Sequence, residues 1–540
     1  MRGRSTRGRV ALLAACGLVC AGGVGSAQAQ TEAGELDGFT PGHAATQRAY
    51  EARFQRGVSA ENIGRLSRGQ SRRPHLVGTG SQQEVVESSL AALRRYGLDA
   101  HMQSYDVYVS RPEQIQVSMT QPYLRHLSVK EQPFPWLQDF GNVVDGYNAY
   151  SSPGDVTGRL VYANYGLPED YAALDQLGVS VAGKIVIVRY GGSFRGVKVH
   201  LAEQHGAKGV IIYSDPEDDG YLQGKVYPEG PWRPADSIQR GSIQFIWDYP
   251  GDPLTPGKPS IPGTKRLQPD QATDLAKIPS TPISYGEAQP LLQALGGQEA
   301  PEAFQGGLPF RYHVGPGPTE AHLNLDIAYE QERVSNAIAV IRGTTHPDEK
   351  VVIGAHSDAW TYGSDDNVSG WTAVMEIGRS LGRLLDRGWR PERTIVLAGW
   401  DGEEYGCSAR LNGASSSAAT SATTSSPTST WMGSPDARST PAASRHSTRR
   451  SSTSPRPSRT REAARSTPRG RATRRRRPSI AWEAARTTRC SSTTSARRRW
   501  RSATPRPAVS TTPPTTTPTR SRSSSIPATS GTRRRRARAA

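Results

Sequence analysis

Cysteine is nearly absent from the body of this 540-residue chain. Two of the four cysteines, Cys16 and Cys20, lie close to the N-terminus, and Cys407 and Cys490 lie in the last quarter of the sequence. Residues 30–406 contain none, which excludes a disulfide framework for that stretch. No apolar run outside the N-terminus approaches the roughly 18 residues that a membrane-spanning helix needs, so we expect no internal span.

Lysine and acidic residues are scarce in the last 130 residues. Residues 411–540 hold 28 arginines, no lysine and three acids, which gives this stretch a net charge of +25. The whole chain carries +18, so residues 1–410 carry −7. A nucleic-acid-binding domain would show a basic patch on its folded part, and the acidic balance of residues 1–410 disfavours that function for them.

The same composition predicts a disordered C-terminal tail. The stretch is built mainly from Ser, Thr, Pro, Arg and Ala and has no Phe, Tyr or Gln, so it cannot bury enough apolar surface to offset the entropy lost on ordering. One interpretation is a genuine cationic tail that binds nucleic acid or other anions through its arginine clusters.

A second interpretation is that the tail is translated out of frame. Codons chosen for Cys407 to Ser415, read in another frame, encode Leu-Gly-Ser-Thr-Glu-Trp-Gly-Glu, and those for Pro427 to Gly433 can encode Asn-Val-Asp-Val-Asp-Gly. A GC-rich gene read out of frame also yields Arg, Ala, Pro, Ser and Thr without Lys. We therefore favour a frameshift directly after Gly406.

The N-terminus has the pattern of an export signal. Four arginines among the first nine residues precede a small, apolar stretch from Val10 to Val24, and Ala27-Gln-Ala29 fits a small-x-small cleavage site. We expect cleavage near Ala29 and a periplasmic or extracellular location. The segment Leu13-Ala-Ala-Cys16 also resembles a bacterial lipoprotein box, which leaves lipid anchoring through Cys16 open.

Strand and helix patterns are interspersed along residues 30–406. Strands are predicted at 105–109, 183–189, 209–214, 336–341, 350–354 and 394–398, and helical segments at 61–96, 197–206 and 370–387. Residues 216–320 are rich in Pro and Gly and predict long loops. The strand–helix–strand order predicts an α/β fold with a mainly parallel sheet.

Side chains that can bind a metal follow two of the predicted strands. The strand at 350–354 leads to His356 and Asp358, Asp366 comes ten residues after His356, and the strand at 394–398 leads to Glu403 and Glu404. Open α/β sheets place ligand sites at the carboxyl ends of their strands, and one imidazole with several carboxylates suits a hard or borderline divalent cation. Each group alone is typical of a solvated or hydrogen-bonded pair, but together they predict a metal-dependent site.

These residues resemble the co-catalytic zinc peptidases of the aminopeptidase/glutamate carboxypeptidase family. The nearest resemblance is to the branch that contains glutamate carboxypeptidase II (folate hydrolase) and the transferrin-receptor-like proteins, and it spans about residues 45–406. The segment hidden in the other frame after Gly406 is also what that family has after Glu-Glu-Tyr-Gly. The further motifs that carry the resemblance are Pro74-His-Leu-Val-Gly-Thr79, Phe194-Arg-Gly-Val-Lys198, Gly206-Ala-Lys-Gly-Val-Ile-Ile-Tyr-Ser-Asp-Pro216, Gly251-Asp-Pro-Leu-Thr-Pro-Gly257, Gly388-Trp-Arg-Pro-Glu-Arg-Thr394 and Trp400-Asp-Gly-Glu-Glu404.

The resemblance implies a zinc-peptidase domain interrupted by a protease-associated (PA) domain. We place the signal peptide at 1–29, the first part of the peptidase domain at 30–106, the PA insert at 107–330, the second part at 331–406 and the low-complexity tail at 407–540. The intact family fold forms a homodimer, and its dimerisation domain is absent from this reading frame.

The resemblance also implies a role for each metal-site residue. His356 would bind one of two Zn²⁺ ions, Asp366 would bridge both, and Glu404 would bind the other. Glu403 would be the general base, which takes a proton from the metal-bridging water as this attacks the peptide carbonyl.

Two residues outside the ligand set receive supporting roles from the same resemblance. Asp358 would orient the ring of His356, and Arg195 would bind the substrate carboxylate, which an arginine fork suits. The alternative for Arg195 is a surface salt bridge. Ser242 stands about where the family has a pocket asparagine, which leaves the glutamate specificity open.

Two further zinc ligands of the family, an Asp and a His, are missing from this frame, so we expect the chain as written to be incomplete and inactive. The choice between carboxypeptidase and aminopeptidase, and the identity of the peptide that is cut, stay open.

One alternative function is that of a non-catalytic, transferrin-receptor-like binding protein. It is disfavoured because ligands and base are both present. The other is a basic-tail protein that binds anions or nucleic acid.

Overall fold

The computed structural model describes residues 36, 38–137, 143–406 and 429–430. The predicted signal peptide at 1–29 and all of the predicted tail except Ser429 and Thr430 lie outside the described residues. In the described part of the chain, no helix combines the length and the apolar character that crossing a bilayer requires.

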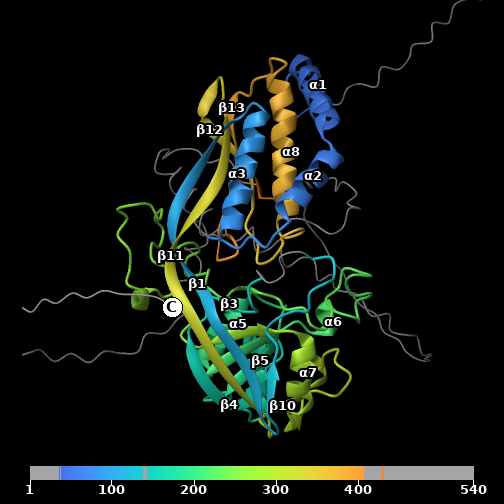
Figure 1. Ribbon diagram of the computed structural model, residues 1–540, viewed down its shortest axis with the longest axis vertical. Helices are drawn as coiled ribbons and strands as arrows, with labels where there is room; N and C mark the ends of the chain where they lie inside the picture. The colour runs from blue at the N-terminus through green and yellow to red at the C-terminus, as the bar shows by residue number, and fades with distance from the viewer. Residues whose placement is uncertain (1–35, 37, 138–142, 407–428, 431–540) are drawn as a thin grey trace, which may run out of the picture. The chain divides into compact units, whose positions relative to one another are not determined.

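Four helices gather beside the strands that lead to the predicted site (Figure 1). They are α1 (Pro41–Gly57), α2 (Ala60–Gln70), α3 (Gly80–Arg95) and α8 (Val368–Leu385). Side chains cap three of the four N-termini: Ser59, Thr79 and Asn367 each accept a hydrogen bond from a backbone N–H in the first turn. The predicted segment 61–96 is thus two helices.

A long antiparallel pair runs through the molecule, β1 (Asp99–Gln121) with β11 (Glu320–Ile341) (Figure 1). The C-terminal half of β11 also pairs antiparallel with β13 (Arg393–Trp400). On the other side of β13 lies β12 (His346–His356), in parallel, and the short β14 (Ser429–Thr430) pairs parallel with β12.

The first half of β11 joins the same sheet to a second group of strands. It pairs antiparallel with β4 (Gly154–Tyr162), after which β5 (Ile185–Arg189), β6 (Gly209–Tyr213) and β8 (Ser280–Ile283) follow in parallel. The helices of this part are α4 (Pro168–Gln176), α5 (Arg195–Gln204), α6 (Pro216–Asp219) and α7 (Tyr285–Gln293). The remaining short strands are β2 (Arg125–Leu127), β3 (Asn148–Ala149), β7 (Gly241–Ser242), β9 (Gln298–Glu299) and β10 (His313–Gly315), and the 3₁₀ helices are η2 (Pro269–Gln271) and η3 (Glu302–Phe304).

The predicted α/β class and the mainly parallel sheet are confirmed. Among the described residues the main sheet has the order β14-β12-β13-β11-β4-β5-β6-β8, with β1 and β2 off this path. All of its antiparallel pairs involve β1 or β11. These two strands are far longer than the runs predicted at 105–109 and 336–341. Their pairing continues on both sides of a register shift between Pro112 and Gln114 instead of ending there.

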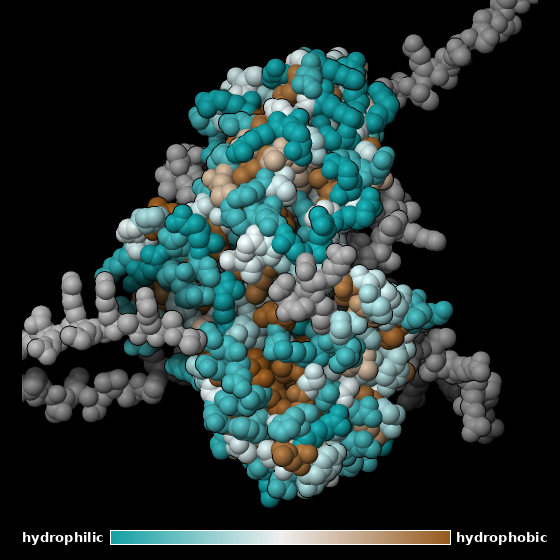
Figure 2. Space-filling view, viewed as in Figure 1, coloured by the Kyte–Doolittle hydropathy of each residue, from teal (hydrophilic) through white to brown (hydrophobic). Residues whose placement is uncertain are grey.

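Two apolar clusters stabilise the two groups of strands. The larger one combines buried side chains of β1 and β11 with those of β4, β5, β6 and β8, and the smaller one lies under α3 and α8, where Trp371 is fully buried. Figure 2 shows a mostly hydrophilic face interrupted by separate apolar patches, as expected for a folded chain whose core is internal.

Candidate active site

The predicted site residues follow two neighbouring parallel strands. In the register of β12 with β13, His356 lies opposite Trp400, the last residue of β13. The backbone N–H of Ser357 donates to the carbonyl oxygen of Trp400 at 2.7 Å. The segments that start at His356 and at Asp401 therefore leave the sheet side by side, as the strand-end argument predicts.

His356 brings two of the predicted carboxylates together. Its Nε2 lies 3.0 Å from Oδ1 of Asp366 and 3.7 Å from Oε2 of Glu403, and its Nδ1 lies 3.0 Å from the carbonyl oxygen of Asp358. The imidazole is buried. Burial lowers the pKa of His356, but the carboxylates of Glu403, Asp358 and Asp366 outweigh burial and raise this pKa well above its usual value. The site therefore favours a cation at Nε2.

Asp358 acts mainly on the backbone that carries the two glutamates. Its Oδ1 accepts from the N–H of Glu403 at 3.2 Å, and its Oδ2 accepts from the N–H of Glu404 at 3.3 Å. The contact with the His356 ring comes from its carbonyl oxygen, while the nearer carboxylate oxygen is 3.5 Å from Nδ1. The side chain thus links the His356 segment to the turn at 402–406.

Glu404 is buried at the centre of this group. Burial raises the pKa of Glu404 well above its usual value, and the nearby carboxylates, Asp366 first among them, raise it further, while His356 lowers it. A carboxylate in such surroundings needs a positive neighbour to stay ionised.

The donor types fit zinc, although the described residues do not gather a complete centre. No three side chains of His, Cys, Asp or Glu in the described ranges converge closely enough to hold a metal ion. The imidazole Nε2 is buried and faces the carboxylates of Asp366 at 3.0 Å and Glu403 at 3.7 Å. An imidazole nitrogen beside carboxylate oxygens is a ligand set that zinc accepts.

Sequence reasoning assigned no role to Asp401, which fixes the start of the turn at 402–406 through hydrogen bonds. Asp401 is buried, and its carboxylate accepts hydrogen bonds from Nε2 of Gln82 at 3.1 Å and from the N–H of Ser335 at 2.8 Å. Burial, with Asp358 nearby, raises the pKa of Asp401 to about 8. Asp401 belongs to the motif 400–404, which was the one sign in the sequence that it has a role. Its hydrogen-bond partners are 66 and 319 positions away, so the spacing of residues could not identify them.

His75 is a second residue that sequence reasoning left without a role. It is fully buried, its carbonyl oxygen accepts from the N–H of Ala359, and its N–H donates to the carbonyl oxygen of Thr361, both at 3.2 Å. Burial lowers the pKa of His75. The motif 74–79 therefore packs against the segment that follows His356.

Arg195 lies on α5, outside the group formed around His356. It begins α5, is buried, and stacks its guanidinium 4.8 Å from the ring centroid of Tyr190. The backbone of α5 touches the segment that continues to Gln244, and Gln244 packs against Gly406 at the end of the glutamate turn. The surface salt bridge considered for Arg195 does not fit a buried side chain, and its role toward substrate stays a prediction.

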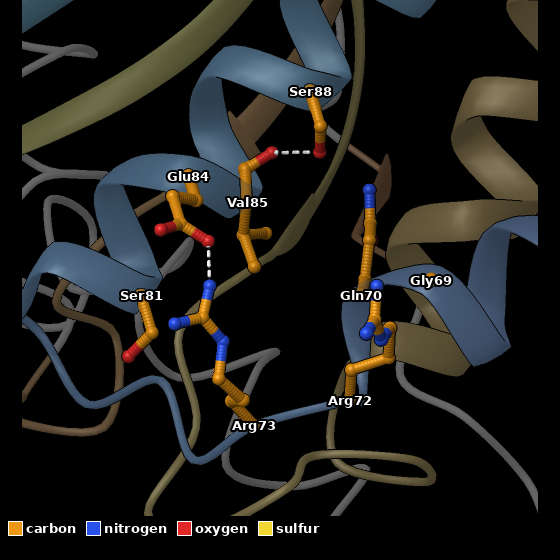
Figure 3. A pocket seen from close by; sticks show the side chains of 8 residues that line it. All are labelled: Gly69, Gln70, Arg72, Arg73, Ser81, Glu84, Val85 and Ser88. Carbon is orange, nitrogen blue, oxygen red and sulfur yellow. Dashed lines mark hydrogen bonds and ion pairs between the residues drawn. The ribbon is translucent and has the colours of Figure 1, made fainter.

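Two adjoining hollows lie on the side of Trp360. The larger, of about 460 Å³, is bordered by Trp360 and Arg111, and the smaller, of about 230 Å³, by Gln70 and Arg72. Both include Arg73 and Ser81. Figure 3 shows Arg73 directed at Glu84, with which it forms an ion pair. The larger hollow reaches the segment that carries Asp358, two residues before Trp360.

Comparison with known families decides what this arrangement belongs to. The family model for the PA domain matches residues 156–246, and the model described as peptidase family M28 matches residues 336–436. The second range includes the five predicted site residues His356, Asp358, Asp366, Glu403 and Glu404. The chain carries a PA domain and a peptidase family M28 domain. The M28 match runs past Gly406 into the residues for which a second reading frame was considered.

Individual relatives agree with this assignment. The chain is 35% identical over 379 residues to aminopeptidase NAALADL1 of Mus musculus, and this alignment covers 65% of the chain and 49% of the relative. It is 35% identical over 374 residues to the glutamate carboxypeptidase 2 homolog of Caenorhabditis briggsae, covering 65% and 48%. The chain thus spans about half the length of these curated relatives.

A likeness to solved structures also exists. The crystal structure of a peptidase M28 precursor from Shewanella amazonensis SB2B matches with a TM-score of 0.44 and 19% identity, over 69% of this chain and 71% of that chain.

Proposed function

We propose that this chain derives from an exported, zinc-dependent exopeptidase of the glutamate carboxypeptidase kind. The observation that carries the proposal is the approach of Asp366 and Glu403 to Nε2 of His356 at the carboxyl ends of β12 and β13. Similarity to relatives named as aminopeptidase and as glutamate carboxypeptidase homologues supports a peptide substrate.

His356, Asp366 and Glu404 are the residues that would hold zinc, two ions in the intact site. When bound, zinc supplies Lewis acidity at a peptide carbonyl. A positive charge here also relieves the repulsion among the buried carboxylates. Glu404 would then be ionised despite its burial.

Glu403 has the chemistry and the position of the general base. Its carboxylate lies beside His356 at the edge of the group, and its side chain is 9% exposed, more than that of His356. It accepts the proton of the attacking water and then donates this proton to the nitrogen of the leaving amine, which balances the hydrolysis of one peptide bond. Arg195, with its planar fork of donors, would bind a terminal or side-chain carboxylate of the substrate.

Zinc binding tests the metal-site assignment directly. We expect the full 540-residue chain to bind Zn²⁺ weakly, because this frame lacks two of the family's ligands. His356→Ala should then lower the affinity at least tenfold, measured by competition with a chromophoric chelator. His322→Ala is the matched control, because that imidazole is 29% exposed and pairs only with Asp155 among the described residues. Equal Zn²⁺ affinity for wild type and His356→Ala would reject the site.

Hydrolysis separates the intact family function from the chain as written. We expect no zinc-dependent release of terminal residues from peptides by the 540-residue chain, because two ligands are missing. Robust activity would defeat the frameshift hypothesis.

Resequencing codons 400–440 of the gene addresses the same hypothesis. One extra base after the Gly406 codon would return Leu-Gly-Ser-Thr-Glu-Trp-Gly-Glu to the frame, and peptidase activity should then appear in the corrected protein. A confirmed sequence would instead assign the arginine-rich tail to the native chain.

Export is a separate part of the proposal. It rests on the arginines and the apolar stretch before Ala29. Mass spectrometry of the secreted protein should find a mature N-terminus near Gln30. A diacylated Cys16 would establish the lipoprotein alternative instead.

A further inference from the structure

The turn that carries Glu403 and Glu404 is held from two sides. On the peptidase side, the carboxylate of Asp358 accepts from the backbone N–H groups of both glutamates. The next two residues, Tyr405 and Gly406, instead contact the insert that the sequence analysis placed at 107–330. The backbone that carries both glutamates is therefore held by two sets of contacts, one from the peptidase part and one from the insert. We call each set of contacts an anchor.

The insert-side anchor is a pair of buried tyrosines. The hydroxyls of Tyr147 and Tyr405 are hydrogen-bonded to each other. The carbonyl oxygen of Ser110 on β1 lies 3.0 Å from the Tyr405 hydroxyl and 3.3 Å from the Tyr147 hydroxyl. Each hydroxyl has one proton, so the hydroxyl that accepts from the other is the one that donates to Ser110. Both rings are fully buried. Hydroxyls in such surroundings are strongly constrained, because a buried polar group without a partner is costly.

Trp360 extends this anchor to the other segment of the site. Its ring lies edge-on to Tyr147 at 5.6 Å between centroids and 5.2 Å from Tyr405. Trp360 follows Asp358 by two residues, and Tyr405 directly follows Glu404. One tyrosine of the insert thus touches both segments that supply predicted site residues. We call Tyr147, Trp360 and Tyr405 the aromatic clamp.

Gly406 reinforces the clamp through its backbone. Its carbonyl oxygen accepts from the N–H of Gly251 at 2.9 Å. A Cβ at Gly406 would lie 1.9 Å from Oε1 of Gln244, so the close approach of the turn to the insert requires glycine.

We propose that Tyr147 is a positioning residue, which holds the turn at 403–405 so that Glu404 and Glu403 face His356. The role toward zinc rests on the proposed function. Glutamate has a long side chain, and the placement of its carboxylate depends on where its backbone is fixed. Groups behind a metal ligand change the metal affinity by about 10–100-fold when removed, because the ligand is no longer preorganised.

The decisive variant is Tyr147→Phe in the full chain. It keeps the ring and removes only the hydroxyl. We expect the dissociation constant for Zn²⁺ alone to rise about tenfold while the midpoint of urea unfolding moves little, since Tyr405 keeps its bond to Ser110. The matched control is Tyr171→Phe, another buried tyrosine of the insert, whose hydroxyl has no hydrogen-bond partner in the described structure. Unchanged Zn²⁺ affinity in Tyr147→Phe would overturn the proposal.

A double variant tests whether the two hydroxyls act as a unit. If they do, Tyr147→Phe combined with Tyr405→Phe should weaken Zn²⁺ binding by less than the product of the single effects. If the double variant weakens Zn²⁺ binding by the full product of the two single effects, the two hydroxyls act independently. Tyr405 would then act through Ser110 alone, and Tyr147 would not position Tyr405.

Amide hydrogen exchange separates this proposal from the proposed function. If the wild-type chain binds no Zn²⁺, the proposed metal site fails, and the clamp is judged by exchange at residues 402–406. We expect these amides to exchange several-fold faster in Tyr147→Phe than in wild type or Tyr171→Phe. Equal exchange in all three proteins would reject the clamp.

Discussion

Single buried carboxyl groups determine much of the electrostatics around the glutamate turn. Asp358 and Asp401 both accept hydrogen bonds from backbone N–H groups, and neither forms an ion pair with an arginine or lysine of the described residues. Asp274 belongs to the same neighbourhood. Its Oδ2 accepts from Nε2 of Gln244 at 2.6 Å, and Gln244 packs against Gly406. Burial raises the pKa of Asp274 to about 7.

Asp274 should make the stability of the protein depend on pH. Its pKa in the unfolded chain is about 3.9, so between about pH 4 and 7 the folded protein holds a proton that the unfolded chain has released. Stability is therefore lost as the pH rises through this window, by at most about 1.4 kcal/mol per pH unit. Asp274→Asn should remove that loss, so its advantage in free energy of unfolding over wild type should grow from pH 4 to 7.

Urea titrations at several pH values measure this difference. Asp175→Asn, at an exposed position on α4, serves as the control and should keep the wild-type pH slope. If Asp274→Asn and wild type show parallel pH profiles, Asp274 is ionised in the folded protein and its assigned pKa is wrong.

At the scale of elements, β13 and α8 place the site by packing tightly against each other. The indole of Trp371 on α8 is fully buried and covers Gly399 on β13, two residues before Asp401. A Cβ at Gly399 would lie 2.6 Å from Cζ2 of Trp371. The strand can approach the helix this closely only without a side chain.

Gly399→Ala should therefore destabilise the protein by about 1–3 kcal/mol, because the ring must move within a packed core. Gly69→Ala is the opposite case, since a Cβ there meets nothing within 4 Å and the residue lies in α2. It should stabilise by up to about 1 kcal/mol. Urea unfolding of both variants tests the pair, and a neutral Gly399→Ala would show that α8 can shift away from β13.

At the scale of the whole described molecule, β1 and β11 join the peptidase part and the insert. Their pairing runs from Asp99 with Val340 to Gln121 with Glu320. Near one end β11 pairs with β13, and near the other end with β4. The two apolar clusters therefore share a backbone ladder instead of being connected by a flexible linker.

We expect this ribbon to make the two parts unfold together. Tryptophan fluorescence, which reports on Trp371 and Trp400 of the peptidase part and on Trp232 and Trp247 of the insert, should change in one transition with urea. Far-UV circular dichroism should give the same midpoint. Two separated transitions would mean that the ribbon can break without unfolding either cluster.

The sequence by itself determined the parts of this protein that depend on local patterns. Strand periodicity and the polar residues after 350–354 and 394–398 predicted His356, Asp366, Glu403 and Glu404 at one edge of the sheet. The structure places Asp366 and Glu403 within 3.0 and 3.7 Å of His356 there, and the roles of all four residues stay predictions. The α/β class followed from the same alternation. The frameshift after Gly406 and the export signal also come from sequence alone, and they stay predictions.

Only the tertiary structure decided how those residues are held. The carboxylate of Asp358 binds the turn 45 and 46 positions away, and Tyr147 meets Tyr405 across 258 positions. The length of β1 and β11 came from pairing across the whole molecule, which local propensity does not encode. A contact between distant residues depends on the folded paths of all the segments between them. Periodicity and spacing therefore identified the chemical groups, while packing set their orientation and their charge.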